Sequence, residues 1–204
     1  GTSNVAVGHE ALKSQTTASY NVAVGYHAGT NNTASSFTAV GNQALYSNTT
    51  GSSNAALGQS ALYTNTTGVE NTAVGDGSLY HNNASYITAV GQNSLNSNTT
   101  GENNTAVGQD ALLANTTGSN NTAVGRQALD ANTTGTENTA VGYNALGASN
   151  AGQCTAVGRS ALANVTTGGG NTGVGHDAGG NVTTGGSNTF FGDNAGSMIT
   201  TGNQ

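Results

Sequence analysis

A short repeat with a nearly fixed period constrains this chain more than any other sequence feature. The stretch Asn121 to Gly125, Asn-Thr-Ala-Val-Gly, occurs twelve times, whole or slightly altered, and its closing glycines are 16 or 17 residues apart. Such a period indicates one structural unit that stacks on its own copies. We therefore treat residues 1–204 as a single repeat array and expect it to be a segment of a longer fibre.

The composition is that of neither an ordinary globular domain nor a disordered chain. Hydrophobic residues make up 34% and charged residues 6% of the 204 residues, and there are 32 glycines and no proline. Disordered segments are typically rich in charge and proline. The remaining alternative, a low-complexity disordered linker, does not explain why valine and leucine return at a fixed phase.

The repeat predicts an all-β fold, a parallel β-solenoid of twelve coils with 16–17 residues per coil. Threonine and valine favour strands, and glycine with polar neighbours favours turns. We expect two short strands and two tight turns in each coil. The absence of proline fits, because proline cannot donate a backbone hydrogen bond to the next coil. Twelve coils would extend about 55–60 Å at the spacing of parallel strands.

The position before the closing glycine is apolar in every repeat, which predicts a core ladder. Its valines are Val7, Val24, Val40, Val74, Val90, Val107, Val124, Val141, Val157 and Val174. The alanine before each of these valines indicates a tight contact. Asparagine also recurs in two columns, and stacked side-chain amides can hydrogen-bond along a column.

A leucine follows an alanine or serine in nine of the repeats, and two interpretations of it stay open. If alanine points inward, strand alternation turns leucine outward. A long apolar stripe usually marks an interface, here an oligomer interface. If the alanine–leucine pair lies in a bend, both side chains enter the core. The candidate interface residues are Leu12, Leu45, Leu62, Leu79, Leu95, Leu112, Leu129, Leu146 and Leu162.

Three intervals have 16 residues, and each replaces the first asparagine of the motif with Phe37, Ile87 or Cys154. We expect the shorter turn to leave these side chains over apolar neighbours. Cys154 is then a small apolar filler. As the single cysteine it excludes an internal disulfide framework and a cysteine-based zinc site.

The repeat resembles the head repeats of the YadA-like trimeric autotransporter adhesins. Val5-Ala6-Val7-Gly8 and Val22-Ala23-Val24-Gly25 are the closest matches, and the likeness returns once per repeat with coils about three residues longer than the family's. Similar arrays occur in phage tail fibres and bacterial surface fibres. The resemblance implies a left-handed parallel β-roll, a homotrimer, and an extracellular place on a cell surface or virion.

No motif for catalysis, a metal or a cofactor is visible. Histidines and acids are scattered over the turns, no nucleophile–base arrangement or phosphate loop occurs, and metal ligands do not visibly converge. Three Lys and Arg residues are too few for a nucleic-acid surface. No apolar run approaches the length of a membrane span.

We therefore expect a non-enzymatic fibre segment of a bacterial surface adhesin or phage tail fibre, which extends a binding tip and contacts a host-cell or surface glycan or protein. Two alternatives remain: an ice-binding solenoid that uses its paired threonines, and a glycan-binding head that uses turn tyrosines. The candidate ligand or ice contacts are Thr50, Thr67, Thr100, Thr117, Thr134, Tyr26, Tyr46, Tyr63 and Tyr143.

Overall fold

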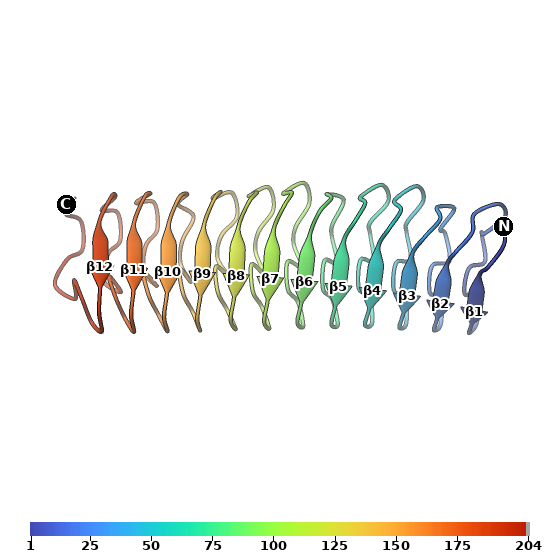
Figure 1. Ribbon diagram of the computed structural model, residues 1–204, viewed down its shortest axis with the longest axis horizontal. Coiled ribbons are helices and arrows are strands. Elements are labelled where there is room, and N and C mark those ends of the chain that lie inside the picture. The colour runs from blue at the N-terminus through green and yellow to red at the C-terminus, as the bar shows by residue number, and fades with distance from the viewer. Residues whose placement is uncertain (203–204) are drawn as a thin grey trace.

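The computed structural model describes residues 1–202 and contains twelve short strands and no helix. No helix that could cross a membrane occurs in this range. The strands form one parallel sheet in sequence order, and Figure 1 shows them as a single row with the two termini at opposite ends. They are β1 (Val5–Val7), β2 (Val22–Val24), β3 (Thr38–Val40), β4 (Ala55–Leu57), β5 (Thr72–Val74), β6 (Thr88–Val90), β7 (Thr105–Val107), β8 (Thr122–Val124), β9 (Thr139–Val141), β10 (Thr155–Val157), β11 (Thr172–Val174) and β12 (Thr189–Phe191).

This architecture confirms the predicted parallel β-solenoid. Each strand pairs with the next in strict register, so that Ala106 lies beside Ala123 and Val107 beside Val124. Backbone hydrogen bonds between coils continue beyond the strands, as where the N–H of Leu112 donates to the carbonyl of Ala128 over 3.0 Å. Nearly every coil is therefore held by its neighbours through the main chain.

Each coil contains one strand, however, and the prediction of a second strand is wrong. The segment after the closing glycine repeatedly enters the left-handed region, with φ of +57° at Asp110 and +51° at Leu112. A residue with positive φ cannot continue a strand. The segment therefore winds as consecutive turns around the leucine.

The interior of the solenoid is lined by the alanine of each strand and by the leucine of the following turn. Ala123 and Ala106 have no exposed surface, and neither has Leu112. The leucine interpretation that placed the residue in the core is confirmed, and the interface interpretation is wrong. The leucines concerned are Leu12, which is 8% exposed, and the fully buried Leu45, Leu62, Leu79, Leu95, Leu112, Leu129, Leu146 and Leu162.

The predicted valine core ladder is wrong, because strand alternation places each valine opposite the buried alanine. Val107, Val124 and Val141 are each 36% exposed, and the other strand valines are half-buried or exposed. Inside the coil, the alanines and leucines form the buried cluster instead. The side chains now found on the outside are Val7, Val24, Val40, Val74, Val90, Val107, Val124, Val141, Val157 and Val174.

One asparagine column forms the predicted amide-to-amide ladder inside the solenoid, and the amides of the other bond mainly to main-chain groups. Nδ2 of Asn115 donates to Oδ1 of Asn98 over 2.8 Å, and Nδ2 of Asn132 donates to Oδ1 of Asn115 over 2.9 Å. In the other column, Oδ1 of Asn104 accepts the backbone N–H of Asn121 over 2.9 Å. The ladders give buried amides partners in the neighbouring coil, which removes the cost of burying them unpaired.

The ladder through Asn132 ends where the repeat changes. Ser149 occupies the next position of the column, and Oδ1 of Asn132 has no hydrogen-bond partner among the described residues. Val165 and Val182 then continue the same column as fully buried apolar residues. The C-terminal coils thus replace an amide column with a hydrophobic one.

The three 16-residue coils behave as predicted. Phe37, Ile87 and Cys154 are at most 2% exposed and belong to the hydrophobic core. Their backbone N–H groups still donate to an asparagine of the preceding coil, as in the 3.0 Å bond from Cys154 to Oδ1 of Asn138. The main-chain pattern therefore survives the loss of one residue.

Aromatic core residues occur where the leucine has become glycine. A Cβ atom at Gly29 would lie 3.0 Å from the ring of Phe37, and a Cβ atom at Gly179 would lie 2.5 Å from the ring of Phe190. The space left by the missing leucine side chain is filled by a phenylalanine from the neighbouring coil. The interior volume is thus conserved while its residues change.

The closing glycine of each repeat is required for two reasons, which Gly125 illustrates. Its φ is +136°, and an added Cβ would lie 2.4 Å from the carbonyl oxygen of Gly142 in the next coil. Another residue would be strained in φ and would also push adjacent coils apart.

The reassigned core predicts that Leu112→Ala and Leu113→Ala have unequal effects, although they remove the same atoms from adjacent positions. Leu112 is fully buried, whereas Leu113 is partly exposed. We expect Leu112→Ala to lower the free energy of unfolding by about 2–5 kcal/mol, and Leu113→Ala to lower it by less than half as much. Chemical denaturation monitored by circular dichroism measures both, and equal losses would contradict the assignment of the core.

Candidate functional site

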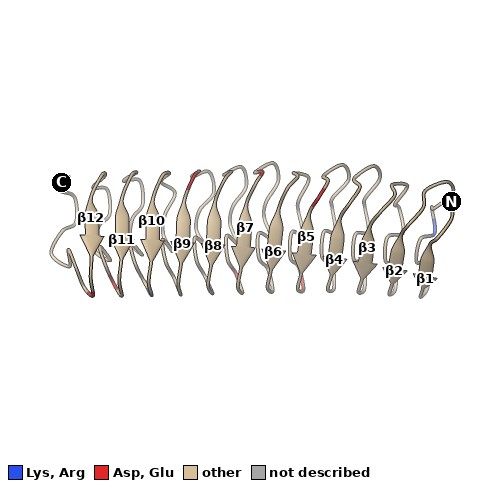
Figure 2. Cartoon of the chain, in the orientation of Figure 1, with Lys and Arg blue, Asp and Glu red and all other residues tan. Residues whose placement is uncertain are grey.

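The outer side of the sheet is a continuous surface, here called the Thr–Val face. It consists of the first and third residues of the strands, for example Thr105 and Val107. None of the strand residues is charged, and Figure 2 shows acidic and basic residues only at scattered places along the rod. Because the register is strict, side chains of one kind lie in rows along the axis.

The paired threonines, such as Thr99 and Thr100, form a second surface at one turn of each coil, here called the corner. The column of first threonines differs from the column of second threonines. The hydroxyl of the first threonine donates to the next coil, as from Thr99 Oγ1 to the carbonyl of Thr116 over 2.9 Å. The second threonine is exposed at each candidate position: Thr50, Thr67, Thr100, Thr117 and Thr134. Thr49 and Thr99 of the first column are exposed as well, but their hydroxyls donate within the stack, so the second column offers more for an external contact.

Beside two of the short coils, where the next coil lacks a threonine pair, an asparagine side chain accepts the hydrogen bonds of the threonine backbone. Oδ1 of Asn83 accepts hydrogen bonds from the N–H groups of Thr66 and Thr67, and Oδ1 of Asn150 does the same for Thr133 and Thr134. The corner backbone is thereby satisfied even though the threonine pair is interrupted.

The four candidate tyrosines already have ring faces in contact with neighbours. Tyr46 and Tyr63 are stacked at a centroid distance of 5.2 Å, and Tyr26 is stacked on His9 at 5.4 Å. The guanidinium of Arg126 lies 5.9 Å from the ring centre of Tyr143. Tyr46 and Tyr63 each have aromatic neighbours in two coils, which favours a structural aromatic ladder for them. By contrast, Tyr26 and Tyr143 are 52% and 44% exposed.

Burial within this ladder raises the pKa of Tyr63, and the neighbouring Tyr80 and Tyr46 add to the effect. The hydroxyl therefore stays neutral over the physiological range. Stacking continues to Tyr80, which lies 5.0 Å from Tyr63. The ladder thus joins consecutive coils through stacked rings.

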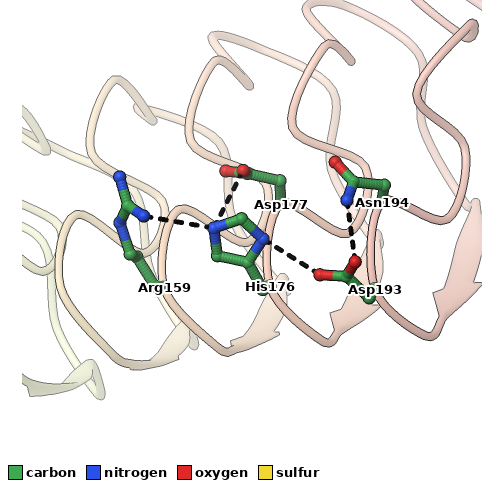
Figure 3. A network of polar contacts seen from close by, with 5 residues as sticks. All are labelled: Arg159, His176, Asp177, Asp193 and Asn194. Atoms are coloured by element: carbon green, nitrogen blue, oxygen red, sulfur yellow. Dashed lines mark hydrogen bonds and ion pairs between the residues drawn. The ribbon is translucent and has the colours of Figure 1, made fainter.

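An exposed polar network joins three of the last coils, as Figure 3 shows. His176 Nδ1 lies 3.0 Å from Asp193, and its Nε2 lies 3.1 Å from Asp177 and 3.3 Å from Arg159 Nη1. Asn194 donates to Asp193 over 2.9 Å. Since the two carboxylates face opposite nitrogens of one ring, they do not converge on one point. Exposed ion pairs of this kind contribute little stability.

A shallow polar groove adjoins this network between the corner turns, with Asn164, Asp177 and Asn181 in its lining. Nδ2 of Asn164 donates to the carbonyl of Gly180, and Nδ2 of Asn181 donates to the carbonyl of Ser197, each over 2.6 Å. These two amides are therefore engaged within the coil stack.

The first two coils bring together His9, Glu10 and His27, a convergence that the sequence analysis did not find. One ligand atom from each of these residues lies within 4.8 Å of the other two. Glu10 and His27 occupy the same position of consecutive repeats. Aligning the repeats and examining each column for metal-binding residue types would have found the pair.

Lys13 also contacts this cluster. Its Nζ lies 2.7 Å from Glu10 Oε1, while Glu10 Oε2 lies 3.7 Å from His27 Nε2. The hydrogen bond to Lys13 lowers the pKa of the Glu10 carboxyl and raises the pKa of Lys13. Glu10 is therefore ionised at neutral pH.

Comparison with known proteins found no matching family model, no matching curated protein and no matching solved structure.

Cys154 is fully buried, and burial raises the pKa of its thiol. Because the thiolate is the reactive species, we expect iodoacetamide to modify Cys154 in the folded protein at pH 8 at least about tenfold more slowly than in guanidinium chloride. Mass spectrometry over time measures both rates. Equal rates would contradict its placement as a buried filler.

Proposed function

We propose that this chain is a non-enzymatic, structural and adhesive segment of an extracellular fibre, on a bacterial surface or a phage tail, that self-associates as a homotrimer. The observation that carries the proposal is the Thr–Val face, an uncharged row of side chains repeated in register over twelve strands. Its role is mechanical: to hold a binding tip at a distance and to offer the same lateral contact many times.

The solenoid suits a load along its axis. Main-chain hydrogen bonds and buried amide ladders link each coil to the next. Any local opening must break several of these contacts together. A rod of this kind stays extended without a large globular core.

The Thr–Val face fits a second copy of the same chain aligned in parallel. Val107, Val124 and Val141 are each 36% exposed. Contiguous apolar surface usually marks an interface. Two identical solenoids have the same axial repeat, so their valine rows stay in phase along the whole length. The lack of charge on the strands also means that no like charges oppose one another.

Attachment to a host-cell or surface glycan or protein would then fall to the variable turn residues. They differ between coils, whereas the strands are nearly uniform. The glycan-binding head is the less supported alternative, because Tyr46 and Tyr63 are stacked between aromatic neighbours. Of the four candidate tyrosines, only Tyr26 and Tyr143 remain largely exposed.

The interface is tested by introducing charge on the Thr–Val face. We expect the unaltered chain to have the native mass of a trimer at micromolar concentration. The triple variant Val107→Glu, Val124→Glu, Val141→Glu should be monomeric, because association would bury three carboxylates per chain without partners. Light scattering after size-exclusion chromatography measures the mass.

The matched control places the same three charges on the corner instead, as Thr100→Glu, Thr117→Glu, Thr134→Glu. These positions are exposed and lie in the same coils or the coils beside them, so this variant should remain a trimer. A monomeric mass for the unaltered chain would overturn the proposed trimer.

Ice binding is the second candidate function, and the exposed second threonine column favours it. Thr100, Thr117 and Thr134 stand at the regular spacing of a parallel solenoid and are exposed. The test is thermal hysteresis at high protein concentration. An ice-binding chain would lose its hysteresis in the corner triple variant and keep it in the Thr–Val face variant. Absence of hysteresis and of crystal faceting in the unaltered chain would exclude this function.

A further inference from the structure

The first two coils contain a group of side chains with the composition of a metal site. His9 and Glu10 lie in the turn after β1, and His27 lies in the same turn after β2. One ligand atom from each lies within 4.8 Å of the other two. We propose that His9, Glu10 and His27 bind one divalent transition-metal ion of the zinc class.

The fold holds the turns that carry these ligands. The backbone N–H of His27 donates to the carbonyl of His9 over 2.9 Å, which fixes the two turns against each other. The His27 ring contacts the ring of Tyr26 at a centroid distance of 4.0 Å and that of Tyr46 at 5.9 Å. His27 is therefore positioned by packing before any ion binds.

The state of His27 without an ion is the observation that favours a ligand. Its side chain is only 17% exposed, and its Nδ1 is buried without a hydrogen-bond partner among the described residues, so an ion would have to bind at the other ring nitrogen and would leave Nδ1 unchanged. Its Nε2 lies 3.7 Å from Glu10 Oε2, too far for a hydrogen bond. A mostly buried imidazole normally satisfies at least one nitrogen within the protein. Nε2 has no hydrogen bond from the described part of the protein to replace, and it lies on the side of Glu10, 3.7 Å from Oε2.

The kinds of ligand atom in this group indicate which metal ion it would bind. Two imidazole nitrogens and one carboxylate oxygen are zinc ligands, and three protein ligands leave a fourth position open. Tetrahedral ligands at about 2.0–2.1 Å from the ion are about 3.4 Å apart. His27 Nε2 and Glu10 Oε2 are 3.7 Å apart, and the group including His9 is closed to within 4.8 Å, so the exposed His9 ring would move inward on binding. Calcium and magnesium prefer sites made of oxygen ligands, which this group does not provide.

Lys13 would compete with a metal ion for the Glu10 carboxylate. It binds Glu10 Oε1 and leaves Oε2 directed toward His27, so one carboxylate oxygen stays available. Its positive charge opposes a second cation at the same carboxylate. Removing Lys13 should therefore strengthen metal binding, an effect that nonspecific binding to surface histidines would not show.

The His176 network provides the matched control within the same chain. It contains one histidine, and its two carboxylates face opposite ring nitrogens. They do not converge on one point, so this network should not bind zinc tightly. Replacing His176 removes an exposed histidine and leaves the proposed site intact.

The experiment is a calorimetric titration of the full chain with zinc chloride, repeated with cobalt, whose visible absorption reports a four-coordinate site. We expect one ion per chain and a zinc-dependent rise in melting temperature, because an ion that binds only the folded state stabilises it. His9→Gln, Glu10→Gln and His27→Gln should each weaken binding by at least about tenfold. Lys13→Met should tighten it severalfold, and His176→Gln should leave it unchanged.

His9→Gln keeps the test valid if His27→Gln disturbs the aromatic packing, because His9 is exposed. Failure of the unaltered chain to bind zinc at micromolar concentration would overturn the proposal. Equal weakening by His9→Gln and His176→Gln would overturn it as well, since it would mean general binding to surface histidines.

Discussion

The structure depends on main-chain hydrogen bonding between coils that follow one another in strict register. Parallel strands are about 4.8 Å apart, so every side chain lies against its own counterpart in the next coil. The repeat can contain only residues that tolerate such a neighbour. At Gly125 even a methyl group would collide with the carbonyl of Gly142. At the asparagine columns the same proximity is favourable, because an amide is both donor and acceptor.

This like-on-like contact also explains the small number and the placement of charges. Two like charges at coil spacing repel by about 1 kcal/mol in water and by more near a protein surface. No position of the repeat has two acids, or two of Lys and Arg, in consecutive coils. Charged columns instead change sign or type, as with Glu10 and His27 and with Arg159, His176 and Asp193. The two polar clusters of the surface are consequences of that alternation.

The period, the parallel stacking and the amide ladders could be predicted from the sequence because each follows from repetition itself. The inward face could not. Alternation separates Ala123 from Val124, but hydrophobicity favours valine for the interior, and the structure places it outside. The deciding element is Leu112, whose φ of +51° is one that leucine rarely adopts. Because the turn carries leucine inward, the alanines and leucines form the buried cluster and the strand valines lie outside it. The cluster at His27 was missed because its residues were considered singly and not by column.

The exchange of Leu for Gly179 and of Ala for Phe190, like the one-residue loss at Cys154, leaves the register of the strands and the main-chain hydrogen bonds between coils in place. The main chain of each coil therefore presents the same pairing groups to its neighbours. Unequal recombination between nearly identical repeats would add or remove whole coils while keeping the main-chain pairing of those that remain. The reach of such a rod is therefore a quantity that a lineage can adjust by copy number alone, independently of whatever the rod carries.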